Sequence, residues 1–192
     1  MLFVLLLSVV AVYAGGISNA KELAAFAKAV NKGEDLSKWR NEKGHIYLEG
    51  DIDMAKMKKW VPITEFKGTF DGKGHALLNW KTKQGLFDII GENSVVKNLR
   101  IDASCTMNVL PGEEIIAGFI ARVNKGTIQN CENGGSIKFK GSYNEKHIYI
   151  GGLVGQNGFV ISDSRNSGSI SAKIFIVSAN KGQSISIGGI AG

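Results

Sequence analysis

An internal repeat limits what this chain can fold into more than any other feature of its sequence. The segment TIQNCENGGSI at 127–137 overlays VISDSRNSGSI at 160–170 when the sequence is shifted by 33 positions, so that Ile128 matches Ile161. Repeats of about 20 to 50 residues are typical of stacked units that bury their apolar faces only against one another. The sequence therefore predicts a solenoid.

Shorter copies surround this overlay. AGFIA at 117–121 overlays GGLVG at 151–155, GLFDII at 85–90 is an earlier copy, and GGIAG begins a further one at Gly188. Each copy consists of short apolar runs of β type separated by Asn and Gly, which tolerate the backbone conformations of tight corners. We expect an all-β fold, a right-handed parallel β-helix that occupies residues 66–192. Because the last copy stops within the motif, we expect a solenoid truncated at its C-terminal end.

The repeat also predicts a register between neighbouring turns. We expect Ile128 to pair with Ile161 and Asn133 to pair with Asn166. Apolar residues at similar places in successive copies should form one buried column, and they are Leu86, Phe87, Phe119, Leu153 and Ile190.

A single amphipathic helix precedes the repeats. Leu23 and Phe26 follow the spacing of one helical face, Asn19 is a suitable N-cap and Gly33 a suitable C-cap, which together predict a helix over 18–30. A solenoid needs such an element because the open strand edge of its first turn invites aggregation.

Strand-like stretches follow the predicted helix. HIYLEGDIDM alternates apolar and polar residues, and TFDGKGHALLNW carries an Asp-Gly turn at 71–72 between two short apolar runs. We assign residues 15–65 to an N-terminal cap that contains the helix and the first strands.

The first fourteen residues, MLFVLLLSVVAVYA, form an uncharged apolar run. The run is too short to cross a bilayer of about 30 Å as a helix. Val12 and Ala14 are the small residues expected before a cleavage site at Gly15, so residues 1–14 are predicted to be a signal peptide. The mature protein should then be secreted or displayed on the cell surface, with no membrane span after signal removal.

The two cysteines, Cys105 and Cys131, permit one disulfide in an exported protein. A disulfide scaffold would contain many more cysteines, so two packed free thiols are favoured, and a bridge stays open as the alternative. The three histidines lie far apart and lack ligand spacing with either cysteine, and therefore neither a metal site nor a cofactor is predicted.

The formal net charge of +6 favours an anionic extracellular or host-surface ligand such as an acidic polysaccharide, whereas export argues against nucleic acid. Lysines gather in MAKMKKW and again around Lys81 and Lys83, although an ordinary solvated face is the simpler explanation of such runs. The candidate ligand-binding residues are Lys56, Lys58, Lys59, Lys67 and Lys73.

A carbohydrate-cleaving β-helix would need two carboxylates held a few ångströms apart, which in a solenoid would lie on one strand or on neighbouring turns. The period instead carries Glu132 onto Arg165 and Asp88 onto Ala121, so no catalytic residue is assigned. Aromatic residues that could stack on sugars are more often core residues. They are Trp39, Trp60, Trp80, Tyr143 and Tyr149.

The segment GGLVGQN, followed by I-x-x-C/S-x-N-x-G-x-I, resembles the GLUG motif repeat of bacterial and some protist surface proteins and of IgA peptidases. The lead-in segments ISNAKELAAFAKAVNKG, IYLEGDIDM and WVPITEFKGTFDGKGHALLNW resemble the section that precedes such repeats, so the likeness covers residues 17–192. It departs from the motif at GFIAR, 118–122. The resemblance implies a β-helix outside the cell and no catalytic residue within the repeats.

The sequence thus predicts a secreted or cell-surface β-solenoid that acts as an adhesion or binding module and is not an enzyme. One alternative is a spacer within a larger surface peptidase, although no HExxH motif occurs in this chain. The other alternative is a polysaccharide lyase or hydrolase.

Overall fold

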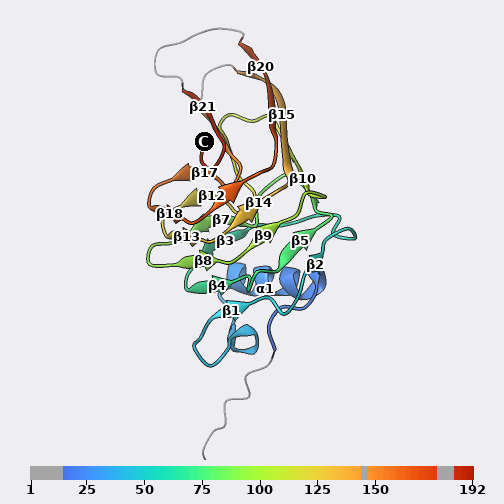
Figure 1. Cartoon of the computed structure of the whole chain (residues 1–192), viewed down its shortest axis with the longest axis vertical. Coiled ribbons are helices and arrows are strands. Elements are labelled where there is room, and N and C mark those ends of the chain that lie inside the picture. Colours follow the sequence, from blue (N-terminus) through green and yellow to red (C-terminus); the bar gives the residue numbers. More distant parts are fainter. Residues whose placement is uncertain (1–14, 144–146, 177–183) are drawn as a thin grey trace, which may run out of the picture.

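The computed structural model describes residues 15–143, 147–176 and 184–192. The segment 1–14, to which the signal peptide was assigned, lies outside the described residues, as does the side chain of Tyr143. Within the described ranges one α-helix is followed by strands β1 to β21 in five sheets (Figure 1), and the strands of each sheet run parallel. The chain is therefore a parallel β-helix.

Three sheets enclose the body of the β-helix and are named A, B and C here. Sheet A contains β3 (Ile63–Phe66), β7 (Phe87–Ile90), β12 (Ala121–Asn124) and β17 (Val154–Asn157). Sheet B contains β1 (Ile46–Tyr47), β4 (Thr69–Asp71), β8 (Val95–Lys97), β13 (Thr127–Gln129) and β18 (Val160–Ser162). Sheet C contains β2 (Ile52–Asp53), β5 (Ala76–Leu78), β9 (Arg100–Ile101), β14 (Glu132–Asn133) and β19 (Arg165–Asn166).

Two further sheets form an arm that extends from the body, with β15 and β20 as its longest strands (Figure 1). Sheet D contains β6 (Lys81–Thr82), β10 (Thr106–Val109), β15 (Ser136–Tyr143) and β20 (Ile170–Ile176). Sheet E contains β11 (Ile115–Ala117), β16 (Ile148–Gly151) and β21 (Ile185–Gly188). A complete turn of the chain passes through sheets A, B, C, D and E in that order.

The register predicted from the repeat is confirmed. Ile128 pairs with Ile161 in sheet B, and Asn133 pairs with Asn166 in sheet C. The side-chain amide of Asn133 donates to Oδ1 of Asn166 at 2.7 Å, and Asn133 itself is fully buried. A buried side-chain amide needs a hydrogen-bond partner. The bond between the two stacked asparagines therefore favours this register over one that would leave the Asn133 amide unpaired.

Asparagine also turns the corner between sheets B and C. Asn98, Asn130 and Asp163 occupy this corner in three successive turns, and each has a positive φ of 49° to 53°. The side-chain amide of Asn130 donates to Oδ1 of Asn98 at 2.8 Å. The Asp-Gly turn expected at Asp71 lies at the same corner, since β4 and β5 belong to different sheets rather than to one hairpin.

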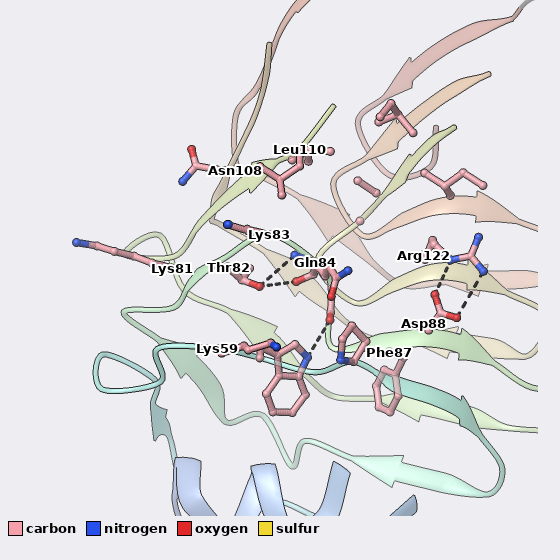
Figure 2. Close-up of a pocket in the computed structure, with 18 of the residues that line it drawn as sticks. Lys59, Lys81, Thr82, Lys83, Gln84, Phe87, Asp88, Asn108, Leu110 and Arg122 are labelled. Atoms are coloured by element: carbon pink, nitrogen blue, oxygen red, sulfur yellow. Dashed lines mark hydrogen bonds and ion pairs between the residues drawn. The ribbon is translucent and has the colours of Figure 1, made fainter. Parts of the chain in front are cut away.

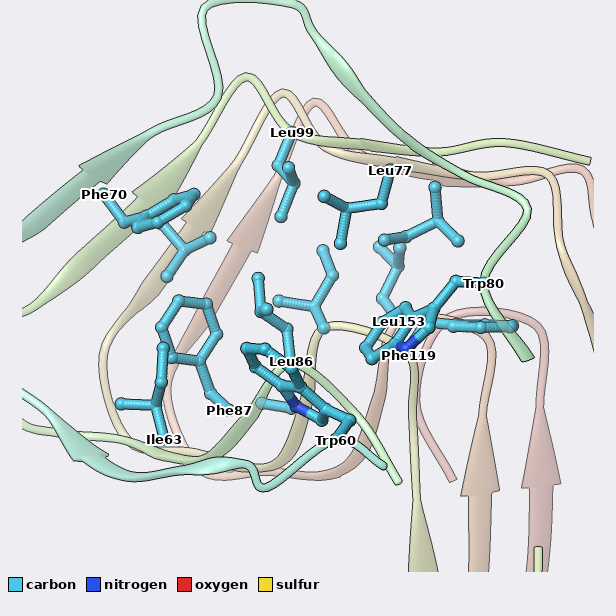
Figure 3. Close-up of a cluster of buried hydrophobic side chains, with 14 of the residues drawn as sticks. Trp60, Ile63, Phe70, Leu77, Trp80, Leu86, Phe87, Leu99, Phe119 and Leu153 are labelled. Atoms are coloured by element: carbon cyan, nitrogen blue, oxygen red, sulfur yellow. The ribbon is translucent and has the colours of Figure 1, made fainter. Parts of the chain in front are cut away.

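The members of the predicted apolar column lie in the core. Leu86, Phe87, Phe119 and Leu153 are fully buried (Figure 3), and Ile190 is partly buried and packs against the core. The amide of Leu86 donates to the carbonyl of Phe119 at 2.9 Å, and the amide of Leu153 donates to the carbonyl of Ile190 at 3.0 Å, so backbone hydrogen bonds join these turns. Phe87 directly follows Leu86 and pairs with Ile63 and Ala121, so the two neighbours cannot occupy one position of the column.

The turn that follows Phe87 contains one extra residue. Phe87 pairs with Ala121 and Ala121 pairs with Val154, so the first of these intervals is one position longer than the second. The amides of Ile120 and Ala121 both donate to the carbonyl of Leu153, so these two residues lie opposite one position of the next turn.

Helix α1 (Ala20–Lys32) covers the first turn of the stack. The side chain of Asn19 accepts a hydrogen bond from the Glu22 amide, and Gly33 closes the helix in the left-handed conformation, as expected. The helix begins and ends two residues later than the range read from the sequence. A short 3₁₀ helix, η1 (Ser37–Trp39), follows it.

The helix also protects the open strand edge of sheet A. The side-chain amide of Asn31 donates to the carbonyl of Pro62 at 2.9 Å, while its Oδ1 accepts from the Thr64 amide at 2.8 Å. On its apolar face, Phe26 packs edge-on against Phe66 with ring centroids 6.3 Å apart. Residues 46–65, which the sequence assigns to the cap, already contribute β1, β2 and most of β3 to the stacked sheets.

The last described turn is more exposed than those before it because its strands are paired on one edge only. Phe159, Val160, Ile185 and Ile187 are 42% to 62% exposed. Among the described residues, no helix is long and apolar enough to cross a membrane.

Both cysteines are free and buried, as favoured from the sequence. Burial raises the pKa of the Cys105 thiol above its ordinary value and raises the pKa of Cys131 from 9.0 to about 11. Each thiol therefore stays protonated at neutral pH and packs as a small apolar side chain.

Replacing Leu153 with Ala should lower the free energy of unfolding by about 2 to 5 kcal/mol, the usual cost of truncating a buried leucine. Val61, whose side chain is 55% exposed, supplies the control. Val61→Ala should change the same quantity by less than about 0.5 kcal/mol. Denaturant titration followed by circular dichroism measures both, and similar losses in the two variants would contradict the column.

Alkylation tests the state of the thiols. Iodoacetamide at pH 8 should label neither cysteine of the folded protein and should label both in denaturant, as read by mass spectrometry. Because the pKa of Cys131 is higher folded than unfolded, its contribution to stability is complete below pH 9.0 and is lost as the pH rises to about 11. Prompt labelling of the native protein at pH 8 would contradict the burial.

Candidate ligand-binding site

A cavity of about 800 Å³ lies where the arm leaves the body of the β-helix (Figure 2). Its lining residues fall within the segments 58–62, 81–88 and 108–118, with Arg122 of β12 added. These segments precede β3, join β6 to β7, and contain the first strands of the arm. A cavity of this size is within the range of ligand pockets, roughly 300 to 1,000 Å³.

The cavity exists because successive turns differ in length. The stretch from Ile63 to its partner Phe87 is much shorter than the stretch from Phe87 to its own partner in the next turn, Ala121. The shorter turn contributes only the brief strand β6 to sheet D and no strand to sheet E. Sheet E therefore has no strand in the shorter turn, and the cavity occupies the place of that missing layer.

Hydrogen bonds fix the floor of the cavity. The indole Nε1 of Trp60 donates to the carbonyl of Gly85 at 3.0 Å, joining two of the lining segments (Figure 2). The hydroxyl of Thr82 donates to the Gln84 carbonyl at 2.7 Å and accepts from the Gln84 amide at 3.1 Å. This small turn sets the backbone from which Lys83 extends.

The arm supplies an aliphatic wall. Val109, Leu110, Ile115 and Ile116 all line the cavity. Leu110 is 54% exposed, although its neighbours in the arm pack against further turns. The preceding strand of sheet D, β6, pairs only with Thr106 and Met107 of β10, so it ends before it could cover Leu110.

Four lysines line the cavity, and they are Lys58, Lys59, Lys81 and Lys83. All four residues are exposed. None of their ammonium groups forms an ion pair with a carboxylate of the described residues. The mouth of the cavity therefore carries four lysine charges that no carboxylate of the described residues pairs with.

The remaining charged groups of the cavity nearly balance. Arg122 forms an ion pair with Asp88, and Figure 2 shows both at the end opposite Lys81. Glu114 is exposed at the start of β11. An anionic ligand would therefore meet four lysines and the single carboxylate of Glu114, so positive charge predominates.

The structure brings together two of the five lysines predicted from the sequence. Lys58 and Lys59 line the cavity, whereas Lys56, Lys67 and Lys73 do not. The cavity therefore accounts for two of the five predicted residues.

Two of the remaining lysines have partners elsewhere. The ammonium group of Lys67 lies 3.6 Å from Oε1 of Glu65. The ammonium group of Lys73 lies 3.6 Å from the ring centroid of Tyr47, a cation–π contact. Both interactions are local to the early turns of the stack.

Sequence reasoning noticed Lys81 and Lys83 but left them out of the site, and it missed the aliphatic wall around Leu110 and Ile116. The available signal was the start of the regular repeat, because the copy at 85–90 has no counterpart one period earlier in the sequence. The missing counterpart indicates that the turn before residue 85 is shorter than the later turns, and the cavity lies at this short turn.

The tryptophans are core residues, as favoured from the sequence. Trp39, Trp60 and Trp80 are at most 9% exposed, so none presents an open ring face to a sugar. Tyr149 is half-buried and stacks on the ring of His147 with centroids 5.7 Å apart.

Acidic side chains of the described stack are largely engaged in ion pairs and turns. Arg165 donates to Oε2 of Glu132 at 2.9 Å, and this hydrogen bond holds the pKa of Glu132 below its ordinary value. Asp88 is held by Arg122. No cluster of three His, Cys, Asp or Glu residues able to hold a metal ion occurs in the described part of the chain. The geometry of the cavity suits retention of an anion by fixed positive charge.

Comparison with known proteins assigns no family. No protein-family model matches the sequence, and no curated protein matches it either. A crystal structure of a protein provisionally named an immunoglobulin A1 protease, from Bacteroides ovatus, is similar with a TM-score of 0.43 and 15% sequence identity. The alignment covers 91% of this chain and 84% of that one. The fold assignment rests on the strand pairing described above, and the GLUG motif remains a resemblance of residues.

Replacing Trp60 with Phe tests the floor of the cavity. The variant keeps an aromatic ring but leaves the Gly85 carbonyl without the indole donor, which should lower the free energy of unfolding by about 1 to 3 kcal/mol. Phe159→Leu, at a side chain that is 62% exposed, is the control and should have little effect. Thermal and denaturant unfolding measure both, and a Trp60→Phe variant as stable as the native protein would contradict this role.

Proposed function

We propose that this protein is a secreted or cell-surface binding module without catalytic activity, which holds an anionic polymer at the cavity beneath its arm. One observation carries the proposal: Lys58, Lys59, Lys81 and Lys83 line one cavity without a carboxylate partner among the described residues. Charges placed at a concave surface attract oppositely charged ligands strongly.

Binding is favoured over cleavage by the state of the acidic residues near the cavity. Glycoside cleavage requires one carboxyl group to act as an acid and a second as nucleophile or base. Of the two carboxyl groups in the cavity lining, Asp88 is engaged in an ion pair with Arg122, which leaves Glu114 without the second carboxyl group that cleavage requires.

Export supports an extracellular polymer as the ligand. The apolar segment at 1–14 has the composition of a signal peptide, and the lysine-rich surface would then meet polymers outside the cell. Acidic polysaccharides and acidic polypeptides both occur in that class of ligand.

Removal of the four cavity lysines should abolish most of the binding. The variant in which Lys58, Lys59, Lys81 and Lys83 are replaced by Gln should bind polygalacturonate or poly-glutamate about tenfold more weakly or worse, as measured by titration calorimetry. Native binding should also fall steeply with salt, because the Debye length shrinks from about 10 Å at 0.1 M to 3 Å at 1 M.

A second variant controls for net charge. Replacing Lys56, Lys67, Lys73 and Lys125 by Gln removes the same number of charges outside the cavity lining, and affinity should stay within about threefold of the native value. Equal losses in both variants, or binding that does not respond to salt, would contradict a site at the cavity. Depolymerisation of either polymer by the purified protein would contradict the absence of catalysis.

A further inference from the structure

The first strand of sheet E, β11, has a partner on one edge only. Sheet E has the order β11-β16-β21, so no described strand pairs with the second edge of β11. The Ile115 amide donates to the His147 carbonyl at 3.0 Å, on the side of β16. Because peptide groups alternate in direction along a strand, the amide and carbonyl of Ile116 point toward the open edge.

This open edge borders the cavity. Ile115, Ile116 and Ala117 all belong to its lining, together with Val109 and Leu110 from the facing side of the arm. The turn from Ile63 to Phe87 is shorter than the next one and supplies no strand to sheet E. The open edge of β11 faces the place that such a strand would occupy. A strand placed there would continue sheet E by one position and cover the exposed Leu110.

We infer that the ligand of this cavity is an extended acidic polypeptide that pairs with the open edge of β11 as an added strand. The inference rests on the proposed function and specifies its ligand. Strand addition to an exposed sheet edge obtains affinity from main-chain hydrogen bonds and selectivity from pockets for alternate side chains.

The two sides of the cavity match such a strand. In an extended peptide successive side chains point to opposite faces, so one set can pack toward the aliphatic wall of Val109 and Leu110. The peptide as a whole passes the unpaired lysines, among them Lys59 and Lys83 (Figure 2). Acidic side chains of the peptide would therefore supply the negative charge that pairs with these lysines.

A polysaccharide fits the same cavity less well. Sugar binding usually relies on exposed aromatic faces, whereas Trp60 is 9% exposed with its indole donor bonded to Gly85, and Phe87 is fully buried. Sugars also lack the regular alternation of N–H and C=O groups that a strand edge recognises.

Ile116→Pro separates edge pairing from charge. Proline removes the Ile116 amide hydrogen, which points away from β16, so the existing ladder of sheet E is retained and proline is tolerated at such an edge. The probe is a peptide in which Glu alternates with Val. Its affinity for Ile116→Pro should fall about tenfold or more, while Ile116→Val, which keeps the amide hydrogen, should bind as the native protein does.

N-methylated peptides test the same point on the unaltered protein. Of two versions of the probe, one methylated on the odd residues and one on the even residues, we expect one to lose binding and the other to retain it. Equal binding of both versions, or native affinity in Ile116→Pro, would overturn strand addition.

The controls keep this inference distinct from the proposed function. The peptide's affinity could depend on the four lysines but be unchanged by Ile116→Pro and by either methylation pattern. In that case the anionic site is supported and strand addition is contradicted. The same holds if polygalacturonate binds more tightly than the peptide. If neither polymer binds the native protein, both the proposed function and the strand-addition inference fail.

Discussion

Backbone pairing between successive turns is the constraint on which the rest of this structure depends. A slip of one residue would turn every buried side chain outward, so the register must be specified at several points. The stacked amides of Asn133 and Asn166 specify it inside the sheets. Glycine permits close approach where the turns touch: a Cβ on Gly168 would lie 1.9 Å from the carbonyl oxygen of Gly135. The same residues that make the repeat visible in the sequence thus hold the turns together.

The fold was predictable to the extent that one turn repeats the next. Ile128 and Ile161 could be paired from the sequence because the spacing between them is free of insertions. Leu86 and Phe87 were assigned to one column although they are neighbours in the chain, and the overlay of short motifs also does not reveal that Ile120 and Ala121 share one position of the neighbouring turn. A single extra residue changes the direction of the side chains that follow, and no local propensity reports it.

The site was predictable only in part, because it arises from what one turn lacks. Lys58 and Lys59 could be found as members of a basic run, but Lys56 in the same run does not line the cavity. Lys83 joins them from the next turn, and Leu110 joins from the turn after that, so no sequence window contains the site. A short turn beneath a longer one produces the cavity, and that contrast appears only when the strands are paired.

The lysines around the cavity also explain how an open strand edge can persist in a stable protein. An unpaired edge invites association with the same edge of another copy, and lysines close to it oppose that association because both copies carry like charge. Helix α1 protects the edge of β3 by direct capping through Asn31, whereas no such side-chain cap is seen at Ile116 of β11 among the described residues. If an acidic strand adds to β11 as inferred above, the same lysines attract it. Charge of one sign would then oppose pairing between two copies and favour the strand that completes the sheet.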